Sequence, residues 1–272
     1  MNTRRLAVVT VAVFAAIGFA AAGCGGSTSG GNAGASTGAS AGAKVSPTPT
    51  LAPKDALVAS TTQLQKTSYK FTMSAAGLSG TGATEAASAK TASMSVSGTE
   101  EGVSIKMDFI LINTDAYIKM DMGQLNAQLG IAANKWMHLD ASKLSSDAGL
   151  PIGDTGDPTD VTGLFAGLND VKTTDGKNFT GTIDMTKATG SSTPDADLLD
   201  KVGAKAKAVP FTASVDDQGR LTSMKIDGSG IDPQLNVSMT FSDYGSPSNV
   251  TKPDASQIVE APSAVQQMFA GN

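Results

Sequence analysis

The side chains that could carry out chemistry are few in this chain of 272 residues. It contains one histidine, His138, and one cysteine, Cys24. A zinc cluster built on several histidines is therefore excluded, and a Ser-His-Asp triad would have to use His138. Two matches to the G-x-S-x-G nucleophile elbow, around Ser36 and Ser40, fall in low-complexity sequence rather than between a strand and a helix. We predict that the chain is not an enzyme and that His138 lies on a strand surface.

Acidic residues offer the other candidates for chemistry. The pairs Glu100–Glu101 and Asp216–Asp217 lie in predicted hairpin turns, where acidic residues favour turn formation. Asp154, Asp157 and Asp160 share a loop rich in Gly and Pro, but their spacing is not that of an EF-hand and the terminal glutamate is missing. A calcium site is the alternative to a plain polar loop, and we predict the polar loop. We expect no catalytic residue, no metal ligand and no cofactor.

Cys24 follows a segment with the three parts of an export signal. Residues 1–5 include two arginines, residues 6–19 are mainly apolar and residues 20–23 are small. The stretch Ala21-Ala22-Gly23-Cys24 resembles the bacterial lipobox, which implies that the cysteine sulfur is diacylated, with chains such as palmitate, and becomes the new N-terminus. Ordinary cleavage after Ala22 is the alternative. Because two or more acyl chains anchor a protein stably, we predict a lipoprotein signal peptide over 1–23 and a lipid anchor at Cys24.

The segment after the anchor has the composition of a tether. Residues 24–53 are mainly Gly, Ser, Ala, Thr and Pro, with no aromatic residue, and cannot bury enough surface to order themselves. A flexible chain of this length reaches about 30 Å on average. We predict a lipidated cysteine and disordered tether over 24–53 and one folded domain over 54–272.

The net charge restricts the partners of this domain. Two arginines are removed with the signal peptide, so the mature chain has 18 basic and 25 acidic residues and a net charge of −7. Nucleic acid and anionic lipid both favour a basic surface. We therefore expect no nucleic-acid partner, and membrane contact through acylated Cys24.

Apolar periodicity predicts a sheet-rich domain. A helix over 53–66 comes first, with Ala56, Leu57, Val58 and Leu64 on its apolar side. Alternation predicts strands over 69–74, 94–97, 103–111, 116–122 and 135–139, then over 178–185, 211–215, 221–226 and 235–241. Helical spacing predicts helices over 161–171 and 194–205 and a short one within 254–272. The strands are typical of an antiparallel meander with one solvent-exposed and one buried face.

These segments, together with Cys24 and its tether, resemble the actinobacterial LppX/LprAFG lipoproteins. The nearest likeness lies in Val209-Pro-Phe211 leading a strand, the hairpin over 218–221 and the ending from Ser242-Asp-Tyr-Gly245 to Val250-Thr-Lys-Pro253. The resemblance implies an α+β, LolA-like fold: a strongly curved antiparallel β-sheet, or half-open barrel, with helices on the concave side. It also implies a hydrophobic cavity for the acyl chains of a lipid or glycolipid, and transport of that lipid in the bacterial cell envelope. We expect a monomer on the extracytoplasmic face of the cell membrane, with a transport partner that the sequence does not name.

Candidate residues for the cavity wall come from the alternating faces. They are Phe71, Met73, Met94, Val96, Ile105, Met107, Phe109, Ile118, Met120, Val237 and Met239, with Leu164, Phe165 and Leu168 as a helical lid. Many are methionines, whose unbranched side chains suit acyl chains of varying length. The same pattern would fill a core that is poor in aromatic residues, so a closed, non-catalytic envelope interaction or sensing module remains the alternative. A hydrolase without a catalytic histidine is a third and more distant one.

Overall fold

The computed structural model describes residues 51–75, 77–100, 102–144, 158–189 and 194–270. Residues 48–272 form one compact unit, and this unit is the subject of the fold description. The predictions for the signal peptide, for Cys24 and its tether up to residue 50, and for Glu101, Asp154 and Asp157 lie outside the described residues.

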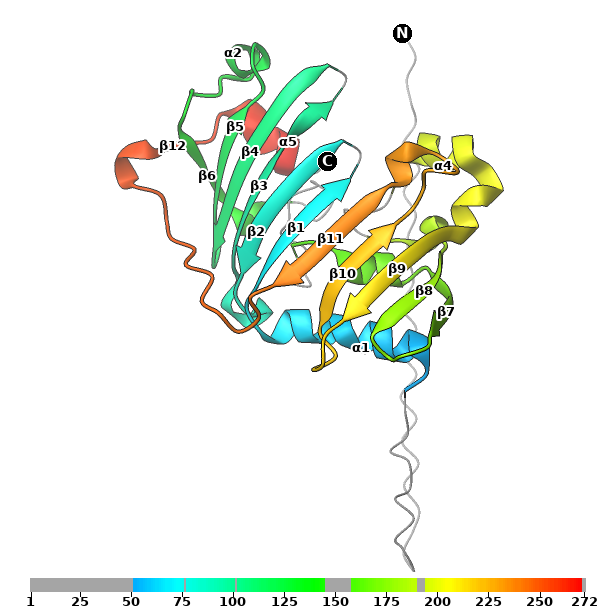
Figure 1. The fold of residues 1–272 in the computed structure, drawn as a ribbon. Helices are drawn as coiled ribbons and strands as arrows, with labels where there is room; N and C mark the ends of the chain where they lie inside the picture. The colour runs from blue at the N-terminus through cyan, green and yellow to red at the C-terminus, as the bar shows by residue number, and fades with distance from the viewer. Residues whose placement is uncertain (1–50, 76, 101, 145–157, 190–193, 271–272) are drawn as a thin grey trace, which may run out of the picture. The chain divides into compact units, whose positions relative to one another are not determined.

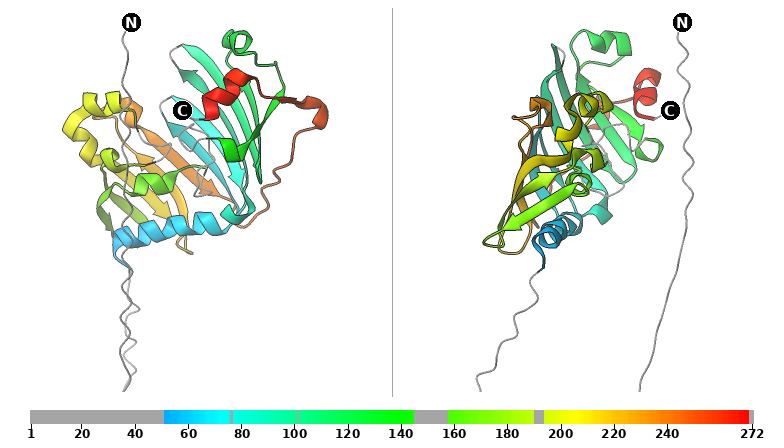
Figure 2. Two further views of the ribbon diagram at one scale, coloured as in Figure 1. Left: turned by 180° about the vertical axis from the view of Figure 1, so that it is seen from behind. Right: turned by 90° about the vertical axis from the view of Figure 1, so that its right-hand side faces the viewer.

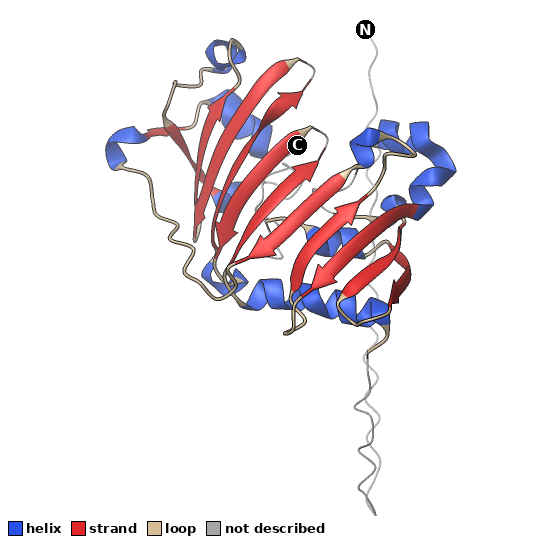
Figure 3. Ribbon diagram, in the orientation of Figure 1, coloured by secondary structure: helices blue, strands red, loops and turns tan. Residues whose placement is uncertain are grey.

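A mixed sheet of 12 strands is the framework of the unit (Figures 1 and 3). The strands are β1 (Tyr69–Ala75), β2 (Leu78–Thr84), β3 (Thr91–Glu100), β4 (Val103–Ile112), β5 (Asp115–Asp121), β6 (Trp136–Asp140), β7 (Leu168–Thr173), β8 (Asn178–Ile183), β9 (Val209–Val215), β10 (Leu221–Ile226), β11 (Val237–Ser242) and β12 (Ile258–Glu260). Their order across the sheet is β12-β6-β5-β4-β3-β2-β1-β11-β10-β9-β8-β7. The strands β12 and β7 are the two edges, so the sheet is not closed into a barrel.

Five α-helices are described beside the sheet. They are α1 (Pro53–Lys66), α2 (Leu125–Leu129), α3 (Val161–Phe165), α4 (Ala196–Val202) and α5 (Ser263–Ala270). The predicted α+β class with one large open sheet is confirmed. A purely antiparallel sheet is wrong, because β12 pairs with β6 in parallel, Ile258 opposite Trp136 and Glu260 opposite His138.

The strand β2 is missing from the prediction because glycine interrupts its apolar alternation. Gly80 and Gly82 occupy positions that face the same side as Phe71 and Met73 of β1. A Cβ at Gly82 would lie 2.4 Å from the ring of Phe71. Glycine therefore leaves room for the Phe71 side chain to lie across the neighbouring strand.

The prediction for residues 161–171 is wrong in its second half. The helix α3 ends at Phe165, and Leu168 begins the edge strand β7, which pairs with β8. Leu168 continues the helical spacing of Leu164 and Phe165 and is also the first residue of the strand, so spacing alone did not separate the two elements. The tail is helical in α5, as predicted, but β12 was not foreseen.

One face of the sheet, called here the inner face, is covered by helices. Figure 2 shows α1 (blue) and α5 (red) in front of the sheet when the molecule is seen from behind. The helix α1 begins at Pro53 and packs against β7, β10 and α3. It buries Leu57 and Leu64, whereas Val58 is 41% exposed and does not belong to the apolar side predicted for it.

The polar residues on the buried side of α1 are hydrogen-bonded within the helix. Ser60 Oγ donates to the carbonyl of Leu57 at 2.6 Å, and Thr61 Oγ1 donates to that of Val58 at 2.8 Å. These bonds remove the cost of burying two hydroxyl groups.

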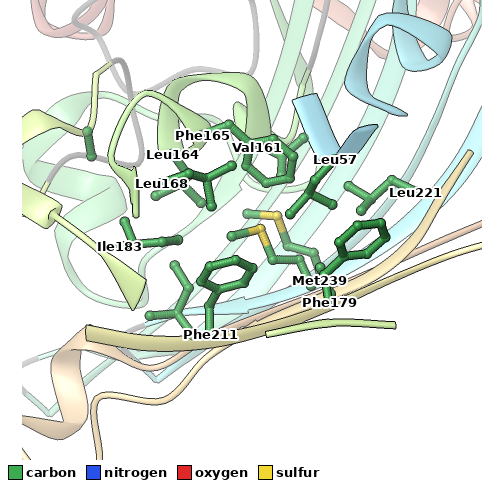
Figure 4. Packing of buried hydrophobic residues seen from close by; sticks show 14 of the residues in the cluster. Leu57, Val161, Leu164, Phe165, Leu168, Phe179, Ile183, Phe211, Leu221 and Met239 are labelled. Atoms are coloured by element: carbon green, nitrogen blue, oxygen red, sulfur yellow. The ribbon is translucent and has the colours of Figure 1, made fainter. Parts of the chain in front are cut away.

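Two separate clusters of buried side chains lie on the inner face. The first, the α1 cluster, joins α1 and α3 to β1, β3 and β7–β11, with partly buried residues of α4 packed against it. Figure 4 shows Leu57, Leu164 and Met239 within this cluster. The second, the α5 cluster, places Ala261, Val265 and Phe269 against β4, β5 and β6. The core is therefore divided, and the division falls between β3 and β4.

Candidate functional site

The register of the sheet aligns the inner-face residues into rows that cross the strands. One row near α1, the aromatic row, contains Phe241, Phe71, Gly82, Met94, Phe109, Ile118 and Met137. All its side chains are buried. The aromatic row is thus closed packing beneath the helices.

The next row is rich in methionine. This methionine row contains Met224, Met239, Met73, Gly80, Val96, Met107 and Met120, each opposite the next across a strand pair. Met224, Met239 and Met120 at its ends are buried, whereas Met73, Val96 and Met107 in its middle are half-buried. The half-buried middle lies where the α1 cluster and the α5 cluster separate.

A third row lies further from α1 and is half-buried along its whole length. This rim row contains Val237, Ala75, Leu78, Gly98 and Ile105, all half-buried. Burial therefore decreases from the aromatic row to the rim row. The half-buried residues of these two rows make up what is called here the open part of the inner face, and it spans about 19 Å from β11 to β4, four strand spacings. In it, Met73, Val96 and Val237 pack against the α1 cluster and Met107 packs against the α5 cluster, while Gly80 is buried between Met73 and Val96.

The predicted wall residues divide into two groups on this surface. The residues that are buried within the clusters are Phe71, Met94, Phe109, Ile118, Met120, Met239, Leu164, Phe165 and Leu168. The half-buried residues, which belong to the open part, are Met73, Val96, Ile105, Met107 and Val237. Leu168 is correctly placed near Leu164 and Phe165 in the α1 cluster but is part of β7 rather than of a helical lid. Ala75, Leu78 and Gly98 also belong to the half-buried rim row and were not among the predicted wall residues.

His138 lies on the outer face of β6, as predicted. Its Nε2 is 2.6 Å from Asp115 Oδ1, and its Nδ1 is 3.7 Å from Glu260 Oε1 of β12. The ring lies 5.3 Å from that of Tyr117, measured between centroids. Both imidazole nitrogens thus face carboxylates, an arrangement that ties β12 to the sheet rather than one aimed at a serine hydroxyl.

The acidic pair Asp216–Asp217 lies in the turn between β9 and β10, and Asp216 stabilises that turn. Asp216 Oδ1 accepts the backbone N–H groups of Gln218 at 2.9 Å and Arg220 at 3.0 Å, while Oδ2 accepts Arg220 Nε at 2.7 Å. Burial raises the pKa of Asp216, but the bonds from Arg220 and Gln218 outweigh it and hold this pKa below its usual value. Asp217 forms an ion pair with Lys177.

The described residues contain no group of three or more His, Cys, Asp or Glu side chains with the geometry of a metal site. Asp160, the described member of the predicted acidic loop, adopts a left-handed conformation immediately before α3. Within the same part of the chain, no helix is long and apolar enough to cross a membrane.

Comparison with known proteins adds no relative. The chain matches no protein-family model, and a search of curated proteins finds none that is similar to it. Arguments about function therefore depend on the surface itself.

Proposed function

We propose that this protein is a non-catalytic lipoprotein with a LolA-like domain of the LppX/LprAFG type, which binds the acyl chains of a lipid or glycolipid and carries them in the bacterial cell envelope. The observation that supports this most is the half-buried, methionine-rich surface between the two buried clusters. This strip crosses five neighbouring strands, β11, β1, β2, β3 and β4. Its side chains pack against the two clusters but keep part of their apolar surface exposed.

The chemistry of the open surface suits an acyl chain. Each buried methylene contributes about 0.8 kcal/mol, so a stretch of about ten contributes roughly 8 kcal/mol before the costs of association. Met73 and Met107 can change rotamer to fit chains of different length or unsaturation. Gly80 lies between Met73 and Val96 and is buried, and a Cβ there would lie 3.1 Å from Met73 Cγ and 3.4 Å from Val96 Cγ2, so glycine leaves room for these two side chains to move.

The anchor and tether would place this surface near its cargo. Acylated Cys24 would hold the protein on the extracytoplasmic face of the cell membrane. A tether with a mean reach of about 30 Å would let the domain approach the membrane to load and move away from it to deliver.

A displacement assay tests the binding. The chain from Gly25 onward contains the whole compact unit and can be titrated with a fluorescent fatty acid such as dansylundecanoic acid. We expect saturable binding that palmitate displaces, and weaker binding in Val96→Gln, which places an amide in the open strip. The matched control is Thr72→Gln, on the outer face of β1, which should bind like the wild type. Absence of binding in all three proteins would contradict the proposal.

The second candidate is an envelope interaction or sensing module that carries nothing. It is favoured by the complete burial of Leu164, Phe165 and Leu168, which pack against the protein itself instead of lining open space. This candidate predicts that enlarging a half-buried inner-face residue destabilises the fold and leaves no ligand to lose.

A further inference from the structure

The outer face of the sheet, opposite the methionine row, carries a hollow of its own. It has a volume of about 520 Å³ and lies over β1–β4, with Trp136 of β6 at one side. Its floor is made of short side chains, Thr81 and Ala83 of β2 and Ser93 and Ser95 of β3. A volume of this size falls within the range of small-molecule sites.

A row of hydroxyl groups crosses the outer face, and three of its members, Thr72, Thr81 and Ser95, line the hollow. Ser223, Thr240, Thr72, Thr81 and Ser95 lie opposite one another on successive strands. Thr72 and Thr240 share a hydrogen bond of 2.7 Å between their hydroxyl oxygens. Hydroxyl groups both donate and accept, so this row offers a ligand both kinds of partner.

The charged groups of the hollow are already paired. Lys70 Nζ is 2.8 Å from Asp243 Oδ2, and Lys119 Nζ is 2.9 Å from Asp108 Oδ2. Asp108 Oδ1 also accepts a hydrogen bond from Ser95 Oγ at 2.6 Å. Burial raises the pKa of Asp108, but the bonds from Ser95 and Lys119 hold it below its usual value, so the carboxylate stays charged and paired. A hollow with neutralised pairs favours an uncharged ligand.

Trp136 gives the hollow an apolar wall. Its indole is half-buried, and Lys119 Nζ lies 4.7 Å from the centre of the ring. This contact and the pairing of Lys119 with Asp108 fix the aromatic plane beside the hydroxyl floor. Ile110 of β4 adds a second apolar group.

We propose that this hollow binds a neutral glycan. A sugar ring presents hydroxyl groups at its edge and an apolar C–H face, which match the Ser/Thr floor and the Trp136 wall. A polyanion would require an excess of basic side chains, and the hollow has none. The site is separate from the acyl surface, because the sheet lies between them, and it would let the protein hold a position on envelope polysaccharide independently of its cargo.

Trp136 is the sole tryptophan of the chain, so its fluorescence reports on this site directly. The chain from Gly25 onward is titrated with maltohexaose, cellohexaose and an α-mannohexaose, with a sulfated hexasaccharide as the charged comparison. We expect a saturable change in emission with at least one neutral hexasaccharide, with a Kd on the order of 1 mM or tighter, and none with the sulfated one.

Two conservative variants on the same face sharpen the test. Thr81→Val removes one floor hydroxyl and should weaken binding about fivefold, the usual effect of one net hydrogen bond. Thr212→Val, exposed on β9 outside the hollow, is the matched control and should bind like the wild type. Displacement of dansylundecanoic acid should be unchanged in both, which keeps this result distinct from failure of acyl binding. No saturable response to any neutral hexasaccharide, or equal affinity in Thr81→Val and the wild type, would overturn the proposal.

Discussion

Met107 and Phe109 provide the sharpest contrast on the inner face. They lie two residues apart on the same side of β4, yet Met107 is half-buried in the open strip and Phe109 is 1% exposed in the α5 cluster. In a solid core, Met107→Trp would overpack its surroundings and cost roughly 1 to 3 kcal/mol. Next to open space, the indole can occupy the room proposed for the acyl chain. We expect its effect on the free energy of unfolding to stay below about 1 kcal/mol.

The same variant should weaken acyl binding. An indole in the strip displaces on the order of four methylenes, or about 3 kcal/mol of gross burial. If other parts of the chain recover half of this, about 1.4 kcal/mol remains, which is a tenfold loss of affinity. Phe109→Ala is the companion variant: it should lose about 3 to 5 kcal/mol of stability, because it opens a cavity in closed packing.

Urea unfolding followed by circular dichroism gives the stabilities, and displacement of dansylundecanoic acid gives the affinities. The reasoning is refuted if Met107→Trp destabilises the protein by about 1 to 3 kcal/mol and leaves acyl binding unchanged. That outcome would make the methionine row ordinary core.

Three further predictions concern the fold. Gly82→Ala should destabilise by about 3 kcal/mol or more in urea unfolding, because the new Cβ would lie 2.4 Å from the Phe71 ring and 2.4 Å from a carbonyl oxygen of β3; a loss below 1 kcal/mol would contradict the packing described. Glu85 Oε1 accepts bonds of 2.6 and 2.8 Å from the side chain and backbone of Ser248, which lower the pKa of Glu85. Its contribution to stability is present above the unfolded pKa near 4.5 and is lost as the pH falls through the lower folded value, so Glu85→Gln should cost about 1 kcal/mol at pH 7 and little at pH 2; equal losses at both pH values would argue against this. Phe269→Ala should lose about 3 kcal/mol and raise amide exchange in β6 above that in β9; unchanged exchange in β6 would show that α5 does not hold the α5 cluster together.

The strongly periodic segments were predictable from the sequence. Residues 103–111 alternate without interruption, so both the strand and its apolar face were found. The strand β2 was missed because Gly80 and Gly82 interrupt its apolar alternation, so Leu78 was not recognised as a residue of the inner face. Leu168 was assigned to a helix because local spacing does not show that this segment pairs with β8.

Which inner-face residues remain open could not be predicted from alternation. Phe109 and Met107 have the same phase in the sequence, and their different burial depends on α5, which lies more than a hundred residues away in the chain. The outer hollow has the same limitation. Thr81, Ser95 and Asp108 meet only because the register of three strands aligns them. Long-range pairing, rather than composition, therefore defines both sites.

Native mass spectrometry of the chain from Gly25 onward, followed by organic extraction, tests the proposed function most directly. The account predicts an additional mass beyond the polypeptide, either as purified from the bacterial envelope or after incubation with envelope lipids, which extracts as an acylated compound and decreases in Met107→Trp. A bare polypeptide mass under both conditions would contradict it, and would assign the inner face to the closed core of an interaction module.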